Sequence, residues 1–120
     1  MKVLVIDDSE IARARMTNQL RLHGHTVLEL PSPIGATRTV LRENVEVVVI
    51  DIHLPTVSGD RLASLFRANP RMKNLGVVLV SGIDPEELLR LAQEVDADAV
   101  VSKGAIDREL PQAVLRAKRG

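Results

Sequence analysis

The sequence contains no cysteine and only one aromatic residue, Phe66. Without cysteine, the chain can form neither disulfide bonds nor thiolate zinc sites, which is typical of proteins in a reducing compartment. Without tyrosine or tryptophan, it has no aromatic surface on which unpaired bases could stack. Sixteen basic residues balance sixteen acidic ones, so the net basic charge of a nucleic-acid-binding surface is missing as well. We therefore expect no direct contact with nucleic acid.

Long hydrophobic runs are also absent. The chain begins with a short apolar run, residues 3–6, which leads directly into Asp7 and Asp8 without a cleavable signal pattern. Hydrophobic residues make up 45% and charged residues 27% of the sequence, which is ordinary for a globular protein. A chain of 120 residues fits one domain with one core. We expect residues 1–120 to form a single domain that is cytoplasmic and does not contact a membrane.

Five apolar runs alternate with five segments of helical periodicity. The run before Asp51 has no polar alternation, which is typical of a strand covered on both faces of a parallel sheet. Because neighbouring parallel strands need a helical connection, this alternation predicts right-handed crossovers. We predict the α/β class, with a doubly wound five-stranded parallel sheet in the order 2-1-3-4-5 and helices on both faces, as in flavodoxin-like folds. The expected strands cover residues 2–6, 26–30, 46–50, 75–80 and 97–101.

Capping residues and proline mark several helix boundaries. Ser9 is the predicted N-cap of the first helix, and Asp84 followed by Pro85 predicts the start of the fourth. Pro111 is tolerated in the last helix only within its first turn, so we expect this helix to begin near Asp107. The third helix is predicted to bury a stripe of Leu62, Ala63, Leu65 and Phe66.

Polar side chains follow four of the five predicted strands. The carboxyl ends of parallel strands meet at one edge of the sheet, where ligands bind. On its own, Asp51 could be a turn residue, since aspartate is common in turns. Crowded carboxylates repel one another, and a divalent cation such as Mg²⁺ relieves the repulsion. With the cation bound, an aspartate can act as a nucleophile toward phosphorus while an ammonium and a hydroxyl stabilise the phosphoryl oxygens. The residues in question are Asp7, Asp8, Asp51, Ser81 and Lys103.

These five residues, together with Leu54-Pro55 and Ser58-Gly59 after the third strand, resemble the receiver domain of bacterial two-component response regulators. The resemblance covers essentially the whole chain. It implies that Asp51 accepts a phosphoryl group from a histidine kinase or a phosphotransfer protein. It also implies that Asp8, Asp51 and the backbone carbonyl of His53 bind Mg²⁺ directly, whereas Asp7 acts mainly through a bound water.

The resemblance further implies how such a domain signals. Lys103 would pair with the phosphoryl group and Ser81 would donate a hydrogen bond to it. In the family, this contact draws the fourth loop inward and reshapes the face formed by the fourth helix, fifth strand and fifth helix. That face would bind a downstream protein target or form a homodimer. The domain would be a signalling switch and not an enzyme, catalysing at most its own phosphorylation and dephosphorylation.

The sequence departs from the family pattern at four positions. Val100 stands where the fifth strand usually carries an aromatic residue that couples phosphorylation to the output face. Gly104 stands where a proline usually follows the lysine. His53 and Ile83 occupy the positions that flank the path of the hydrolytic water in the family. Because Ile83 cannot orient a water and His53 is bulky, a slow loss of phosphate is expected.

Two other functions remain open from the sequence. A receiver-like protein-interaction module that signals without phosphate would explain Val100 and Gly104. A stand-alone phosphohydrolase with an aspartate nucleophile commonly has a second carboxylate two residues after the first, where this chain has His53. The cognate kinase and the downstream target cannot be identified from the sequence, and the chain could be a whole protein or the receiver of a longer one.

Overall fold

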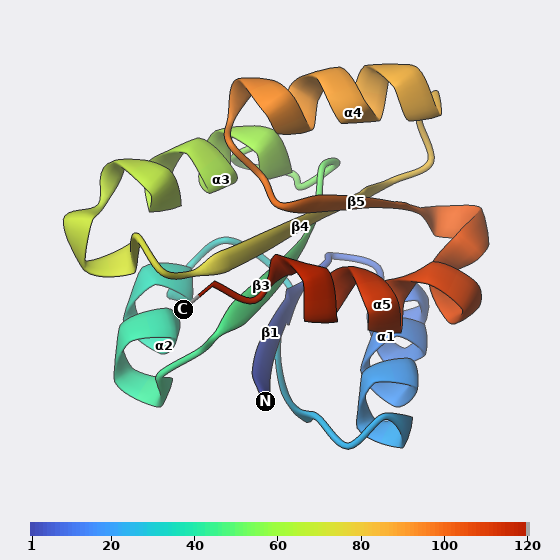
Figure 1. Ribbon diagram of the computed structural model, residues 1–120, viewed down its shortest axis with the longest axis horizontal. Helices are drawn as coiled ribbons and strands as arrows, with labels where there is room; N and C mark the ends of the chain where they lie inside the picture. Colours follow the sequence, from blue (N-terminus) through green and yellow to red (C-terminus); the bar gives the residue numbers. More distant parts are fainter. Residues whose placement is uncertain (120) are drawn as a thin grey trace.

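The computed structural model describes residues 1–119, which form five parallel strands alternating with five α-helices (Figure 1). The sheet order is β2-β1-β3-β4-β5, and every neighbouring pair is parallel, so the predicted fold is confirmed. The elements are β1 (Lys2–Ile6), α1 (Glu10–Leu22), β2 (Thr26–Leu30), α2 (Ala36–Glu43), β3 (Val47–Asp51), α3 (Gly59–Ala68), η1 (Pro70–Met72), β4 (Gly76–Ser81), α4 (Pro85–Glu94), β5 (Ala99–Ser102), η2 (Lys103–Ala105) and α5 (Ile106–Ala117).

Helices cover both faces of the sheet, and the strands divide their side chains between two cores. In β1, Leu4 and Ile6 belong to the cluster that includes buried residues of α2, α3 and α4, whereas Val3 and Val5 belong to the cluster under α1 and α5. This division follows from the alternation of side chains along a strand. All five residues of β3 are buried. A strand covered on both faces needs no polar alternation, as its sequence indicated.

The predicted helix starts are confirmed where a side chain caps the helix. The Ser9 hydroxyl accepts a hydrogen bond from the Ala12 amide at 3.2 Å, at the beginning of α1. The Asp84 carboxylate accepts one from the Glu87 amide at 3.3 Å, and Pro85 is the first residue of α4. Each cap gives an otherwise unpaired amide of the first turn a partner.

Two details of the helices differ from the prediction. Leu65 was expected in the buried stripe of α3, but it is 57% exposed because the stripe facing the sheet consists of Leu62, Ala63 and Phe66. Pro111 lies in the second turn of α5 and not in the first, because the helix begins at Ile106, directly after the turn of η2. The Pro111 ring is buried, so a residue that lacks the backbone donor of this turn still contributes apolar surface to the core.

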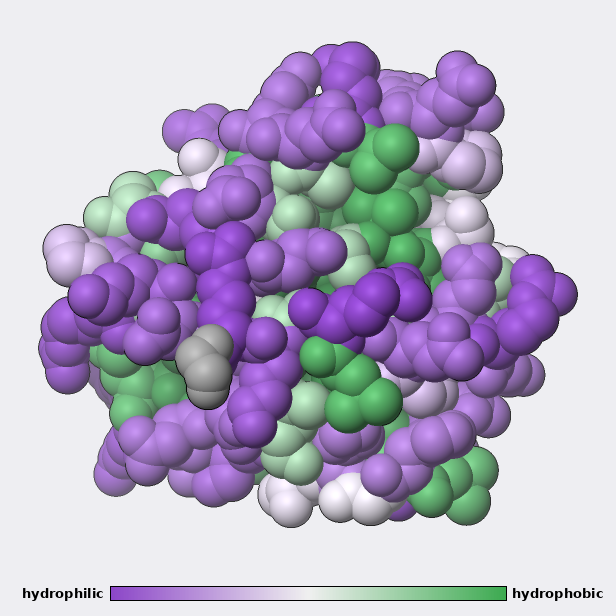
Figure 2. Space-filling model, in the orientation of Figure 1, coloured by the Kyte–Doolittle hydropathy of each residue, from purple (hydrophilic) through white to green (hydrophobic). Residues whose placement is uncertain are grey.

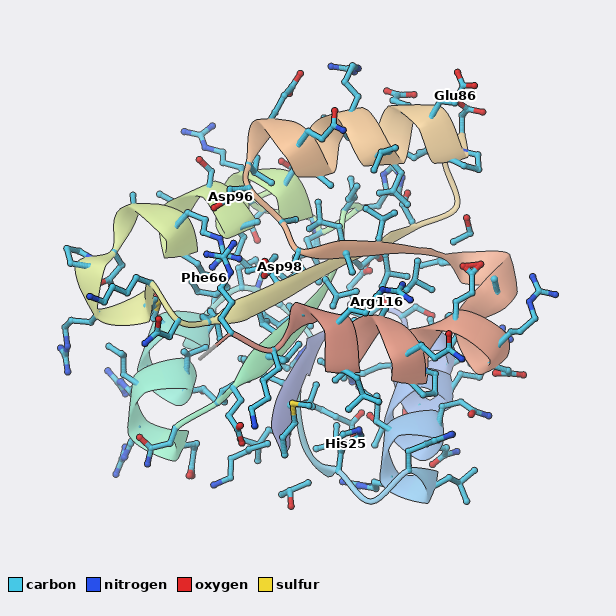
Figure 3. The ribbon with its side chains drawn as sticks, in the orientation of Figure 1. His25, Phe66, Glu86, Asp96, Asp98 and Arg116 are labelled. Carbon is cyan, nitrogen blue, oxygen red and sulfur yellow. The ribbon has the colours of Figure 1, made fainter. Side chains whose placement is uncertain are left out.

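At the amino edge of the sheet, an ionic cluster ties α3 and the end of the chain to β5. Arg67 of α3 donates hydrogen bonds to the Asp98 carboxylate at 2.6 Å and to the Asp96 carbonyl at 2.8 Å. Arg119 donates to the other oxygen of Asp98 at 2.8 Å. Asp96 and Asp98 lie in the connection between α4 and β5, on the side of α3 (Figure 3). This cluster lies at the end of the sheet opposite to the predicted site.

The visible surface is largely hydrophilic, but hydrophobic side chains gather between α4 and α5 (Figure 2). Val100 of β5 is half-buried and packs against the same core cluster as Leu88 and Ala92 of α4. Among residues 1–119, no helix is both long enough and apolar enough to cross a membrane.

Candidate functional site

The register of the sheet brings the predicted residues together at its carboxyl edge. Ile6 pairs with Ile50, so the residues that follow them, Asp7 and Asp51, lie side by side. Asp51 in turn pairs with Val80, the residue before Ser81. Ser81 pairs with Ser102, the residue before Lys103. The order and register of the strands therefore bring these separate positions of the sequence to one edge of the sheet.

Asp51 is the last residue of β3, and its side chain is only 1% exposed. One carboxylate oxygen accepts a hydrogen bond from the His53 amide at 3.1 Å. The other accepts one from the Lys103 ammonium at 3.1 Å. The carboxylate is thus held in place by a backbone donor and a cation. A carboxylate oxygen held in a fixed position at the carboxyl edge of the sheet is a suitable nucleophile.

Lys103 lies in η2, immediately after β5, and reaches toward two carboxylates. Its ammonium is 3.1 Å from Asp51 and 3.6 Å from Asp7. Burial alone would lower the pKa of this ammonium, but the hydrogen bond and negative charge of Asp51, with the charge of Asp7, raise the pKa above its ordinary value. Lys103 therefore keeps its positive charge at neutral pH. The loop that contains Gly104 is ordered as a short 3₁₀ turn.

Asp7 is the carboxyl group of the cluster whose charged form is disfavoured by its surroundings. Its side chain is fully buried, and Oδ1 accepts a hydrogen bond from the Ser9 amide at 2.8 Å. Oδ2 has no hydrogen-bond partner. Burial raises the pKa of the Asp7 carboxyl, and the charge of Asp51 adds to the rise, whereas the Ser9 amide and Lys103 oppose it. This buried oxygen lies 3.6 Å from the Lys103 ammonium, beyond hydrogen-bond distance, and is therefore available to bind a metal cation.

The three carboxylates of Asp7, Asp8 and Asp51 can hold a metal ion. They offer ligand atoms that all lie within 4.8 Å of one another, and the exposed Asp8 opens the group to solvent. The Lys103 ammonium contacts two of these three carboxylates, those of Asp7 and Asp51. A hard divalent cation with a preference for carboxylate oxygens fits this group. The predicted role of the His53 carbonyl as a further ligand stays a prediction.

Ser81 ends β4 and is fully buried. Its hydroxyl oxygen accepts a hydrogen bond from the Ile83 amide at 3.1 Å. A hydroxyl can donate through its hydrogen while it accepts through a lone pair. The Ser81 hydroxyl can therefore donate one further hydrogen bond, and its predicted role toward a phosphoryl group stays a prediction.

Sequence reasoning missed Arg13, and it named Gly59 as part of the motif after the third strand without foreseeing its contact. Arg13 of α1 donates a hydrogen bond to the Asp7 carbonyl at 2.8 Å. Gly59, the first residue of α3, approaches the Asp51 backbone so closely that an added Cβ would lie 2.2 Å from the Asp51 carbonyl oxygen. Each contact joins a helix to the strand directly before it, and it depends on how closely that helix approaches the strand end, which the spacing of the residues does not indicate.

The first prediction concerns the charge of Asp7. Because its pKa is raised in the folded state, folding favours the protonated form, and stability falls as pH rises through the unfolded pKa of about 3.9. Asp7→Asn should therefore stabilise the metal-free protein at pH 7 by about 1 to 3 kcal/mol, the typical cost of an unpaired buried polar group. The gain should shrink below about pH 4. Denaturant unfolding in EDTA at several pH values measures it.

Asp8→Asn is the matched control for this prediction. Asp8 is exposed, so losing its charge should change the stability of the metal-free protein by only about 0.5 kcal/mol. Equal stabilities of the wild type and Asp7→Asn at pH 7 would show that burial of the Asp7 charge is not costly.

The second prediction concerns the contact between α3 and the acceptor strand. A methyl group at position 59 cannot fit beside the Asp51 carbonyl, so α3 must move away from β3. Gly59→Ala should destabilise the protein by about 1 to 3 kcal/mol, as overpacked substitutions do. Gly104→Ala is the control, since no atom lies within 4 Å of a Cβ added there. Denaturant unfolding measures the stability of both variants. Equal stabilities of Gly59→Ala and Gly104→Ala would disprove the steric argument.

Taken together, the five-stranded parallel sheet and the acidic cluster at its carboxyl edge define a receiver domain. The family model described as the response regulator receiver domain matches residues 3–115, and the chain belongs to this family. The identification from the motifs is thereby confirmed. Receiver domains are signalling switches and not enzymes in the usual sense, and they typically bind Mg²⁺ in an acidic pocket.

Several characterised proteins are similar to this chain. A gliding motility regulatory protein of Myxococcus xanthus is 30% identical over 97% of this chain, which corresponds to 15% of that protein. A cyclic di-GMP phosphodiesterase of Thermotoga maritima is 33% identical over 86% of this chain and 27% of its own length. The TorCAD operon transcriptional regulatory protein TorR of Escherichia coli is 27% identical over 97% of this chain and 48% of its own length. The chain thus spans less than half the length of these relatives.

Solved structures agree on the fold. The receiver domain of a Francisella response regulator is 25% identical and superposes with a TM-score of 0.82, covering 95% of this chain and 93% of that one. The chemotaxis protein CheY4 of Vibrio cholerae is 20% identical with a TM-score of 0.79, covering 95% and 92% of the two chains.

Proposed function

We propose that this chain is a phosphorylation-operated switch in which Asp51 accepts a phosphoryl group from a histidine kinase or a phosphotransfer protein. The observation that carries the proposal is the contact of the Asp51 carboxylate with the Lys103 ammonium, 3.1 Å apart, beside two further carboxylates. A nucleophile, a fixed cation and a cluster of cation ligands are the parts that phosphoryl transfer to an aspartate needs. We place this reaction in the cytoplasm.

Each residue has a definite part in the transfer. A carboxylate oxygen of Asp51 forms a bond to phosphorus as the bond from phosphorus to the histidine nitrogen of the donor breaks. Lys103 offsets the charge of a phosphoryl oxygen, and Ser81 donates a hydrogen bond to another. Asp7, Asp8, Asp51 and the His53 carbonyl would hold Mg²⁺, with Asp7 acting mainly through a water. The cation neutralises charge on the phosphoryl oxygens when it is bound.

The output would leave the domain through the face formed by α4, β5 and α5. Hydrophobic side chains are exposed between these helices (Figure 2), which fits the binding of a downstream protein or of a second copy of the chain. Val100 takes the place of the usual aromatic residue and is half-buried there. The step from Asp51 to this face therefore works without the rotation of an aromatic ring.

Chemical phosphorylation tests the proposal directly. The purified protein is incubated with acetyl phosphate in the presence of Mg²⁺ or EDTA, and its intact mass is measured. We expect the addition of one phosphoryl group, dependent on Mg²⁺, and a titratable response to beryllofluoride by NMR. Absence of both responses would overturn the proposal and favour a receiver-like interaction module that signals without phosphate.

The third prediction concerns the lifetime of the phosphorylated form. His53 is exposed beside Asp51, and the half-buried Ile83 packs against the core, so neither offers a small polar group to orient an attacking water. Replacing His53 by asparagine or Ile83 by glutamate should accelerate the loss of phosphate by about tenfold, which is less than the roughly 10²-fold of a weak general acid or base, because the added group only orients the water. The decay of the phosphorylated mass after removal of acetyl phosphate measures this rate. Fast loss in the wild type, unchanged in both variants, would contradict the prediction.

A further inference from the structure

Arg13 links the acidic turn after β1 to the edge strand β2. Its Nη1 donates a hydrogen bond to the Asp7 backbone carbonyl at 2.8 Å, and its Nε donates to the Glu29 carboxylate at 3.2 Å. The Arg13 side chain is only 17% exposed, so the guanidinium lies between the two elements and not in solvent. A planar guanidinium can hold two acceptors in a fixed relation, which the flexible ammonium of lysine does less well.

The bond from Arg13 completes the fixation of Asp7. The Asp7 amide donates to the Leu30 carbonyl at 3.2 Å, and Oδ1 accepts from the Ser9 amide at 2.8 Å. With the carbonyl held by Arg13, three of the four polar atoms of this residue have partners. The fourth, Oδ2, is the buried oxygen without a donor. Its position is set by the bonds to the other three and by the Lys103 ammonium, 3.6 Å away.

We propose that Arg13 is a positioning residue for the divalent cation of this site, and that Glu29 acts through Arg13. The bridge between the Asp7 carbonyl and Glu29 holds the β1–α1 turn in the form in which Asp7, Asp8 and Asp51 converge. This inference rests on the proposed function, because it concerns the binding of the cation at the same site. It assigns roles to two residues that contact neither the phosphoryl group nor the cation.

The sign of the effect separates positioning from simple electrostatics. Arg13→Gln removes a positive charge near an acidic cluster, so an effect of charge alone would tighten the binding of Mg²⁺. Loss of positioning would weaken it. Outer-shell partners of metal ligands typically change metal affinity by at least about tenfold, so we expect a dissociation constant about 10-fold higher in Arg13→Gln.

Arg15 provides the matched control on the same helix. Its exposed guanidinium pairs with Asp107 at 3.4 Å and makes no contact with Asp7. Arg15→Gln removes the same charge, and we expect the affinity for Mg²⁺ to stay within about twofold of the wild type.

A double-mutant cycle tests whether Glu29 works through Arg13. Glu29→Gln should weaken Mg²⁺ binding in the wild-type background and have no further effect in Arg13→Gln. If Glu29 acted only through its negative charge, Glu29→Gln would weaken Mg²⁺ binding equally in both backgrounds. The readout is titration of the full chain with MgCl₂, followed by backbone amide NMR shifts. Thermal unfolding in EDTA checks that each variant is folded, and Glu29→Gln alone carries the test if Arg13→Gln is not.

A second readout distinguishes positioning from general damage to the site. At saturating Mg²⁺, Arg13→Gln should be phosphorylated by acetyl phosphate at nearly the wild-type rate, since only the affinity for the cation is reduced. Equal or tighter Mg²⁺ binding by Arg13→Gln would overturn the positioning role while leaving the proposed function intact. A wild-type protein that binds no Mg²⁺ would overturn both.

Discussion

Replacing Asp51 by asparagine is expected to abolish phosphorylation by acetyl phosphate. The amide of asparagine has the shape of the carboxylate, but it lacks the charged oxygen that attacks phosphorus. The neighbouring groups stay in place, because an amide oxygen can still accept a hydrogen bond from the His53 amide or from the Lys103 ammonium, each 3.1 Å from the present carboxylate. The loss should therefore be one of chemistry and not of folding. Intact mass measurement in Mg²⁺ and acetyl phosphate gives the result.

Asp107→Asn is the control for the acceptor assignment. Asp107 is an exposed carboxylate in the first turn of α5, paired only loosely with Arg15. Its substitution should leave the amount and the rate of phosphorylation unchanged. Incorporation of phosphate into Asp51→Asn at the wild-type rate would mean that another group is the acceptor.

The fold was largely predictable because its signals are local. The five apolar runs and the helical segments between them are read from neighbouring residues, and parallel pairing then follows from the length of the connections. The observed strand and helix boundaries differ from the predicted ones by only one or two residues, as expected because the ends of helices and strands fray. Leu65 shows where this reasoning fails. Helical periodicity places it near the apolar stripe, but the angle at which α3 lies on the sheet decides which side of the stripe is buried.

The site was predictable for a different reason. In a parallel sheet, the end of each strand is also a position on one edge, so a linear list of strand ends becomes a spatial cluster. Taken alone, Asp51 could be an ordinary turn residue. It became a candidate acceptor because Lys103, Asp7 and Asp8 were predicted at the same edge. The contacts of Arg13 and Gly59 could not be found in this way. They depend on how helices sit above the strands, which no spacing along the chain encodes.

The same limit applies to the ionic cluster at the amino edge. Arg67 and Asp98 are 31 positions apart, and Arg119 is a further 21 positions along the chain. In the sequence, these residues are ordinary surface charges. In the structure, the side chains of Arg67 and Asp98 are only 11% and 16% exposed. Burial lowers the pKa of Arg67, which reflects the cost of removing its charge from water, while Asp98 opposes this shift. The cluster thus matters more to stability than its sequence indicates.

Asp98→Asn is therefore expected to be among the most destabilising single substitutions of a charged residue in the chain. The Asp98 carboxylate accepts hydrogen bonds from Arg67, from Arg119 and from the Val77 amide at 2.8 Å. Removing the charge leaves the buried Arg67 with only the exposed Asp96 carboxylate, 3.8 Å away, as a counter-ion, and breaking a buried ion pair typically costs about 3 to 5 kcal/mol. Because the amide oxygen of asparagine can retain one of these bonds, we expect the free energy of unfolding to fall by about 3 kcal/mol, as measured by denaturant unfolding.

Asp96→Asn is the matched control, because it removes the same charge from the same cluster at an exposed position. The Asp96 side chain is 74% exposed, so its ion pairs with Arg67 and Arg119 should contribute only about 0.5 kcal/mol. Asparagine also tolerates the left-handed backbone of this residue, where φ is 56°. Similar losses in the two variants would contradict the role of burial. Since the cluster lies at the edge opposite to Asp51, Asp98→Asn protein that remains folded should still accept phosphate, which separates the residues that maintain the fold from those that use it.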